Sequence, residues 1–444
     1  MSATTLRGRA SAGQAAAEST RRRLAILLDS WRYSGTGRDL RLDLLRGFAV
    51  FAMIADHIGG DPSWLYRLTG GDRFFTTAAE GFVFISGLVF GIVYAGVLAR
   101  QGLAEGMMKA LRRAGVLYLL TVVLTLATAA AAVRFQLYWA PQDVTRATLR
   151  DFVLSVVTLH RTFYMTDVLL LYTLLLVCAA ASLVFFATGR TWMVLATSWG
   201  LWALWQLDYR YASFVWGIQG NDIFHLVPWQ LLFFTGLAIG YHRVALARRF
   251  GWAVGPWSLA ISGGLFAWLI VLFRTNLAGF PGANNPRVVE WFTYKPNVGP
   301  GRVFAFAVVA IFAISLTTTL WRPLARATSW LLLPLGQHAL FAYSIHLFIL
   351  GLTWRLSVAL LGYGPSTGEH VFLQLAGIAA VLWAIKLKLR LMFLCAAAEL
   401  ARAGTALPRA AALVSFDNLD AMHLRRGRGT CPRRLFFGPR VGPL

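Results

Sequence analysis

Ten apolar segments are the feature that most limits what this chain can fold into. Each is about as long as a helix needs to be to cross the roughly 30 Å hydrocarbon layer of a bilayer. Hydrophobic residues make up 57% of the chain and charged residues 14%, which is the composition of a membrane protein. The sequence therefore predicts an all-α integral membrane protein with about ten transmembrane helices in one bundle. The predicted spans are residues 44–60, 80–99, 114–133, 163–187, 191–207, 227–241, 256–273, 303–320, 330–352 and 371–395.

Lys and Arg are concentrated in the two termini and in alternate loops. Because positively charged loops stay on the cytoplasmic side, both termini are expected to be cytoplasmic. This pattern predicts a basic tail at 1–43, a membrane domain at 44–395 and an Arg-, Gly- and Pro-rich tail at 396–444. The net charge of +23 fits anionic lipid headgroups better than nucleic acid, since no aromatic and basic recognition module interrupts the spans. The three cysteines form neither a disulfide framework nor a zinc spacing, and no metal and no permanently bound cofactor are expected.

The first span carries ionisable side chains in the segment DLLRGFAVFAMIADH, residues 43–57. On a helix the eleven steps from Arg46 to His57 leave a net offset of about 20° and a separation of about 16 Å, so both side chains share one face. Asp43 is within about 40° of His57 on the same helix. The spacing predicts a polar stripe whose two ends look into one water-accessible passage.

An imidazole inside a bilayer span needs a hydrogen-bond partner or a wet cavity. We interpret His57 as a general base that takes a proton from a hydroxyl while this hydroxyl attacks an activated acyl carbon. Asp56, or Glu80 at the start of the second span, would orient the imidazole. Alternatively, His57 is a structural histidine that donates a hydrogen bond to a carbonyl or to Asp56. Glu80 would then only be a negative side chain that is stabilised by the N-terminus of its helix.

The ninth span contains GQHALFAYSIHLF, with three further polar rings in an apolar helix. Tyr343 and His346 are three residues apart and should adjoin. One of His338 and His346 is expected to line the site, and the alternative is hydrogen bonding between helices. Weaker candidates are Asp167, Asp222 and His225. The repeats of small residues at Gly87, Gly91 and Ala95 and at Gly236 and Gly240 predict close helix packing.

Several segments in this order resemble the OpgC family, within the acyltransferase-3 superfamily of integral-membrane acyltransferases. They are RDLRLDLLRG at 38–47, DHIG at 56–59, AAEGFVFISGLVFG at 78–91, DVLLLYTLLL at 167–176, PWQLLFFTGLAIGY at 228–241 and GQHALFAYSIH at 336–346. The resemblance implies a bacterial inner-membrane enzyme that transfers an acyl group, usually succinyl, from cytoplasmic acyl-CoA to hydroxyls of an osmoregulated periplasmic glucan. It also implies that His57 is the essential base and that Arg46 is needed for activity.

On this hypothesis the catalytic residues are His57, Asp56 and Glu80. The substrate-binding residues are Arg46, Asp43, Tyr343, His346 and His338. Two alternatives remain open: an exporter of a glycan or lipid-linked sugar, and the same enzyme with an acetyl donor or another polysaccharide. The sequence does not decide between direct transfer and a covalent acyl-enzyme, nor does it define the oligomeric state.

Overall fold

The computed structural model describes residues 29–387, except 36, 59–62, 72–73, 138, 142–143, 146–147, 164, 208–216, 252–253 and 362–366. The chain divides into two compact units, residues 1–395 and 396–444, and every described residue belongs to the first. The predicted tail at 396–444 and most of the predicted tail at 1–43 therefore lie outside the described residues.

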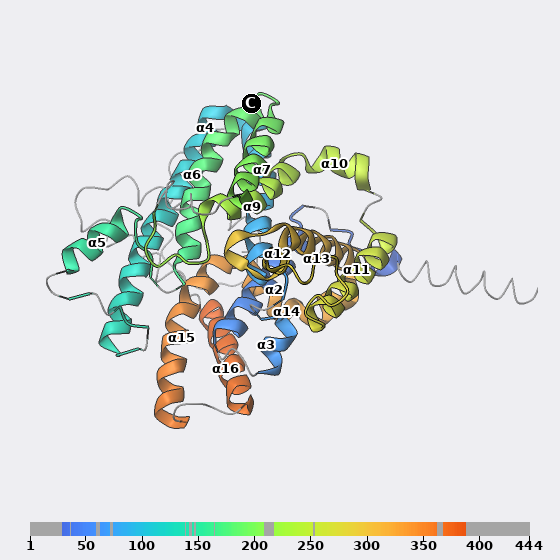
Figure 1. Cartoon of the computed structure of the whole chain (residues 1–444). Coiled ribbons are helices and arrows are strands. Elements are labelled where there is room, and N and C mark those ends of the chain that lie inside the picture. The colour runs from blue at the N-terminus through green and yellow to red at the C-terminus, as the bar shows by residue number, and fades with distance from the viewer. Residues whose placement is uncertain are drawn as a thin grey trace, which may run out of the picture. The chain divides into compact units, whose positions relative to one another are not determined.

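The described chain is built from helices, and its order is shown in Figure 1. The first half contains α2 (Leu40–His57), α3 (Trp64–Thr69), α4 (Ala78–Arg134), α5 (Leu149–Val157), α6 (Asp167–Ala187) and α7 (Thr191–Leu207). The second half contains α9 (Leu226–Tyr241), α10 (Arg243–Phe250), α11 (Pro256–Arg274), α12 (Pro286–Thr293), the 3₁₀ turn η3 (Lys295–Asn297), α13 (Pro300–Thr319), α14 (Trp321–Gln337), α15 (Ala339–Leu361) and α16 (Thr367–Lys386). Within the described ranges, the only β-type pairing outside these helices is one isolated bridge between Arg161 and Gln219.

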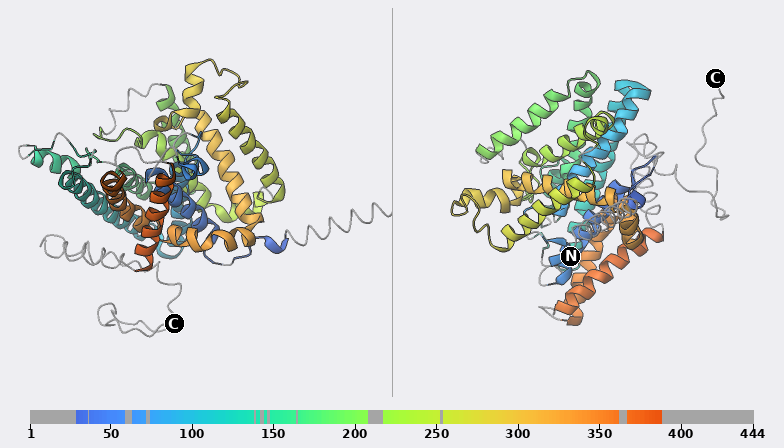
Figure 2. Two further views of the ribbon diagram at one scale, coloured as in Figure 1. Left: turned by 90° about the horizontal axis from the view of Figure 1, so that it is seen from below. Right: turned by 90° about the vertical axis from the view of Figure 1, so that its right-hand side faces the viewer.

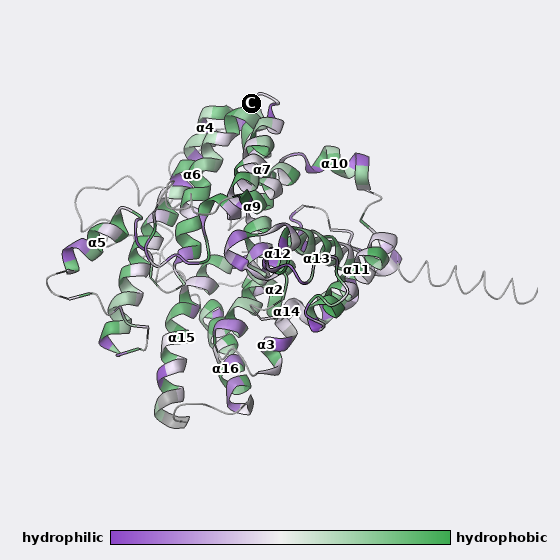
Figure 3. Ribbon diagram, in the orientation of Figure 1, coloured by the Kyte–Doolittle hydropathy of each residue, from purple (hydrophilic) through white to green (hydrophobic). Residues whose placement is uncertain are grey.

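Six of the described helices are long and apolar enough to cross a membrane: α4, α6, α11, α13, α15 and α16. Helix α9 is apolar but shorter, and the apolar character of these helices is visible in Figure 3. Helix α2 is not among the six, and it carries two aspartates and two arginines in 18 residues. The chain is thus an all-α protein of the multi-pass membrane class. The count of ten spans and the cytoplasmic position of both termini stay predictions.

Helix α4 contains two of the predicted spans, residues 80–99 and 114–133. Gly102 interrupts the helix with φ 80° and ψ 178°, a conformation open to glycine because it has no Cβ. A Cβ added at Gly106 would lie 2.8 Å from Cδ1 of Leu98, whereas residues eight apart on a straight helix are separated by about 12 Å. The chain therefore reverses at Gly102, and α4 is two arms packed against each other.

The predicted span at 330–352 is divided into α14 and α15. His338 leaves the helical conformation between them, with φ −115° and ψ 31°. The break allows α14 to pack along the N-terminal half of α2, while α15 reaches the C-terminal end of α2 at His57. A single continuous helix over residues 330–352 would not make both of these contacts with α2.

Glycines bring two pairs of helices into backbone contact. A Cβ added at Gly87 or Gly91 of α4 would collide with carbonyl oxygens of α9, and one added at Gly236 or Gly240 of α9 would collide with those of α4. The prediction that these glycines serve close packing is confirmed.

Helices α2 and α14 meet in the same way. A Cβ at Gly47 would collide with the carbonyl of Leu332, and one at Gly336 with the carbonyl of Asp43. The C-terminal end of α2 is held from another side by Gln374 of α16, which donates to the carbonyl of Ala55 at 2.7 Å. Helix α2 is therefore a central element with both of its ends fixed.

Helices α11 and α13 pack side by side (Figure 2).

Candidate functional site

Two histidines from distant parts of the chain meet at the C-terminal end of α2. Nδ1 of His57 lies 3.0 Å from Nε2 of His346 on α15, and the ring planes are inclined by only 25°. His346 is fully buried, and its Nδ1 is hydrogen-bonded to the carbonyl oxygen of Tyr343. The predicted neighbourhood of Tyr343 and His346 is confirmed, with ring centroids 4.9 Å apart.

These contacts determine which ring nitrogens carry protons. The carbonyl of Tyr343 can only accept, so we assign a proton to Nδ1 of His346. A buried imidazole is cheaper to keep neutral, and in the neutral ring Nε2 holds the lone pair and accepts from Nδ1–H of His57. In neutral His57 the lone pair is then on Nε2. The pair orients His57 with Nδ1 as a hydrogen-bond donor and Nε2 as the nitrogen that carries the lone pair.

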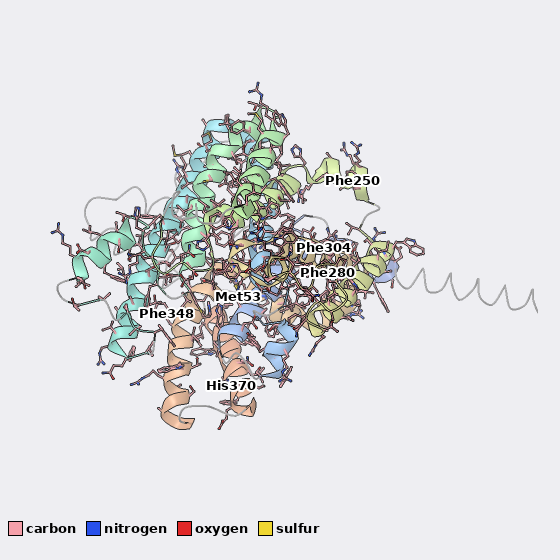
Figure 4. The ribbon with its side chains drawn as sticks, in the orientation of Figure 1. Met53, Phe250, Phe280, Phe304, Phe348 and His370 are labelled. Atoms are coloured by element: carbon pink, nitrogen blue, oxygen red, sulfur yellow. The ribbon has the colours of Figure 1, made fainter. Side chains whose placement is uncertain are left out.

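His57 lines a cavity of about 110 Å³. The cavity also receives predicted site residues from three helices: Asp56 of α2, Tyr343 of α15 and Asp167 of α6. Lys295 of η3 and Thr77 also line it, and neither was predicted. Met53, another lining residue, is labelled in Figure 4. The remaining lining residues are Ala78, Ala79, Met165, Val168, Ile223 and Phe224.

Two of these lining residues are held by hydrogen bonds to the surrounding fold. Oδ1 of Asp56 accepts from the hydroxyl of Thr69 on α3 at 2.5 Å. The hydroxyl of Tyr343 donates to the carbonyl of Met165, just before α6. Both side chains are thereby oriented at the cavity, and the Tyr343 hydroxyl also links α15 to the start of α6.

Glu80 forms a buried ion pair instead of lining the cavity. Its Oε1 accepts from Nε of Arg302 on α13 at 2.9 Å, and Nη2 of Arg302 contacts the same oxygen. Its Oε2 accepts from the backbone N–H of Thr77 at 2.9 Å and from the Thr77 hydroxyl at 2.5 Å. Glu80 is 0% and Arg302 1% exposed. The contacts of Glu80 thus stabilise the start of α4 and hold Thr77 at the cavity wall, and its predicted catalytic role stays a prediction.

The other end of α2 carries Asp43 and Arg46. Nε and Nη2 of Arg38 donate to the two carboxylate oxygens of Asp43 at 2.7 Å and 2.8 Å. Arg46 interacts electrostatically with Asp43, Arg113 and Tyr172. Because α2 is one helix from Leu40 to His57, the two ends of the predicted stripe do share it. Arg46 does not line the His57 cavity, and the common passage stays a prediction.

The remaining candidates lie elsewhere. His338 ends α14. His225 precedes α9 and its ring lies 5.5 Å from that of Trp205. Burial lowers the pKa of His225, and the neighbouring Asp222 opposes this shift. Within the described part of the chain, no three His, Cys, Asp or Glu side chains are grouped so as to hold a metal ion.

Fold and site together define a multi-pass, all-α membrane protein in which His57, paired with the buried His346, lines a cavity. The family model for OpgC protein matches residues 38–391. The chain belongs to the OpgC family, and this membership indicates a transferase with a glucan-modifying, acyltransferase-like function. Neither a search of curated proteins nor a search of solved structures gave a match.

Proposed function

We propose that this chain is an inner-membrane O-acyltransferase of the acyltransferase-3 superfamily. It moves an acyl group, most simply succinyl, from cytoplasmic acyl-CoA to hydroxyls of a periplasmic glucan. The observation that carries the proposal is the contact between Nδ1 of His57 and Nε2 of His346. This contact leaves the lone pair of His57 on Nε2, and His57 lines a cavity together with Asp56, Asp167 and Lys295.

In the proposed reaction His57 acts first as a base and then as an acid. Nε2 of His57 takes the proton of the glucan hydroxyl while the hydroxyl oxygen attacks the thioester carbonyl carbon. The C–S bond then breaks, and the departing thiolate of CoA takes the proton back from Nε2. His57 returns to its starting tautomer, and one ester replaces one thioester.

The opposite end of α2 is proposed to bind the donor. Arg38 pairs with Asp43 in two hydrogen bonds, so the Asp43 charge is already matched by one guanidinium. Arg46, with Arg113 nearby, then leaves an excess of positive charge at this end. Phosphates of CoA, or the free carboxylate of a succinyl group, would form charge-assisted hydrogen bonds with Arg46.

The proposal is tested with the full chain purified and reconstituted in liposomes. We expect consumption of succinyl-CoA that depends on added glucan, and a glucan product heavier by one succinyl group in mass spectrometry. The same assay with acetyl-CoA tests the alternative donor. Movement of glycan across the bilayer without acyl-CoA, and with no mass change, would instead identify an exporter.

A further inference from the structure

Asp167 is a carboxylate at the cavity that the proposed reaction does not use. It is the first residue of α6, is 9% exposed and lines the cavity of His57. Its hydrogen bonds come from backbone N–H groups at the start of α6, with the nitrogen of Val168 2.9 Å from Oδ1. Among the described residues, no side-chain donor reaches this carboxylate. Burying a carboxylate that only backbone N–H groups contact costs free energy. Because this carboxylate lies at a cavity wall, it indicates a ligand that donates a hydrogen bond to it.

Lys295 brings a positive charge to the same cavity. It is the first residue of η3, and its ammonium lies 5.7 Å from the centroid of the Phe224 ring. Lys295 interacts electrostatically with Asp167, yet the two side chains form no direct ion pair. Asp167 and Lys295 therefore bring opposite charges to one cavity without contacting each other directly.

This arrangement selects a ligand by its chemistry. A hydroxyl group both donates and accepts, so one hydroxyl can donate to the carboxylate of Asp167 and accept from the ammonium of Lys295. An anionic group is less suited to this cavity. It would be attracted by the ammonium of Lys295 but repelled by the carboxylates of Asp56 and Asp167, and a partly buried site screens this repulsion weakly. The rings of Phe224 and Tyr343 add apolar surface on which a sugar ring can pack.

We propose that Asp167 and Lys295 bind a hydroxyl of the acceptor sugar, next to the hydroxyl that His57 deprotonates. The cavity is then the subsite of a neutral polyhydroxylated acceptor, and the charged donor binds elsewhere. This inference rests on the proposed function, since it assigns the acceptor to the side of His57.

The test separates the KM of the acceptor from the KM of the donor. Asp167→Asn keeps the shape of the side chain and removes its charge, and Lys295→Met keeps the stem and removes the donors. In the liposome assay we expect each variant to raise the KM for glucan about 10-fold, the effect of losing one hydrogen bond to a charged group. The KM for succinyl-CoA should stay within about 2-fold of the wild-type value. Matched controls are Asp151→Asn, at an exposed residue, and Lys109→Met, whose side chain is 40% exposed. Both should leave the two constants unaltered.

An unchanged KM for glucan in both variants, or a raised KM for succinyl-CoA alone, would overturn the inference. A second measurement needs no variant. On the wild-type protein, glucan oligosaccharides that each lack one hydroxyl should include one, other than the acylated position, whose KM rises about 10-fold or more. If every single deletion is tolerated, the inference fails. A wild-type protein that shows no glucan-dependent use of acyl-CoA would instead refute the proposed function itself.

Discussion

Nδ1 of His57 lies 3.0 Å from Nε2 of His346, although 289 positions separate the two residues in the chain. The contact joins the C-terminal end of α2 to the N-terminal half of α15. Two hydrogen bonds in series, the second ending on the backbone carbonyl of Tyr343, orient the ring of His57. These hydrogen bonds keep the imidazole of His57 in one tautomer and one orientation, as the proposed role of general base requires.

Replacing His57 should abolish the proposed chemistry. We expect His57→Ala to lower the rate of acyl transfer by about 100-fold or more, because a positioned general base contributes at least that factor. The rate is measured as glucan-dependent release of CoA from reconstituted protein. His160→Ala is the matched control, since His160 is an exposed histidine away from the cavity. Unchanged transfer by His57→Ala would contradict the assignment of the base.

His346 should act through His57. In His346→Phe the acceptor of the Nδ1 proton is lost, so His57 divides between two tautomers and we expect kcat to fall about 10- to 100-fold with both KM values kept. Nitrogen NMR of labelled histidine provides the second readout: wild-type His57 should show a deprotonated Nε2, and the variant a mixture. A variant with wild-type kcat and an unaltered His57 spectrum would remove His346 from the mechanism.

Arg46 should affect the donor and not the acceptor. We expect Arg46→Ala to raise the KM for acyl-CoA about 10-fold, the effect of losing one charge-assisted hydrogen bond. Initial rates at low and high donor concentration measure this change. Arg190→Ala, which changes an exposed arginine in a loop, serves as the control. Wild-type kinetics at low donor concentration would exclude Arg46 from the donor site.

The buried pair of Glu80 and Arg302 should stabilise the fold. Removing one partner leaves an uncompensated charge, so Arg302→Met is expected to destabilise by about 3–5 kcal/mol. The double variant Glu80→Gln/Arg302→Met should be more stable than Arg302→Met alone, because no unpaired charge remains. Unfolding in detergent measures both. Lys109→Met breaks the exposed pair of Lys109 and Glu105 and should change stability by less than about 1 kcal/mol. If Arg302→Met costs no more than this control, the pair does not stabilise the fold.

The glycine contact between α2 and α14 should tolerate no side chain. Gly336→Ala places a methyl group against the carbonyl of Asp43, and we expect a loss of about 1–3 kcal/mol. The control is Gly115→Ala in α4, where a Cβ would meet no atom within 4 Å and alanine favours the helix by up to about 1 kcal/mol. Equal unfolding temperatures of the two variants in detergent would contradict the contact.

Local features of the fold were predictable from the sequence. Helices α6, α9 and α11 follow predicted spans closely, because each is a continuous apolar run. The adjacency of Tyr343 and His346 follows from a spacing of three residues on a helix. The division of residues 330–352 at His338 was not predictable, because it results from two packing contacts that α14 and α15 make with α2.

The site was predictable only where its residues could be recognised one at a time. His57 stands out as an imidazole in an apolar span, and Asp56 follows from its position beside it. Lys295 is the first residue of the short η3 and Arg302 lies in the first turn of α13, and the role of each depends on partners far away in the sequence. The ion pair of Glu80 was not predictable, because the sequence does not show that Arg302 lies against it.

The backbone contact of α2 with α14 at Gly47 and Gly336 has a consequence for how the protein works. The close backbone contact holds α2 against α14, and within α2 the single helix from Leu40 to His57 keeps the Arg46 guanidinium and the His57 imidazole at a constant separation. Carriers that move one bundle of helices against another must loosen such backbone contacts in every transport cycle. A fixed contact between α2 and α14 suits a protein in which the helices stay in place and the substrates move.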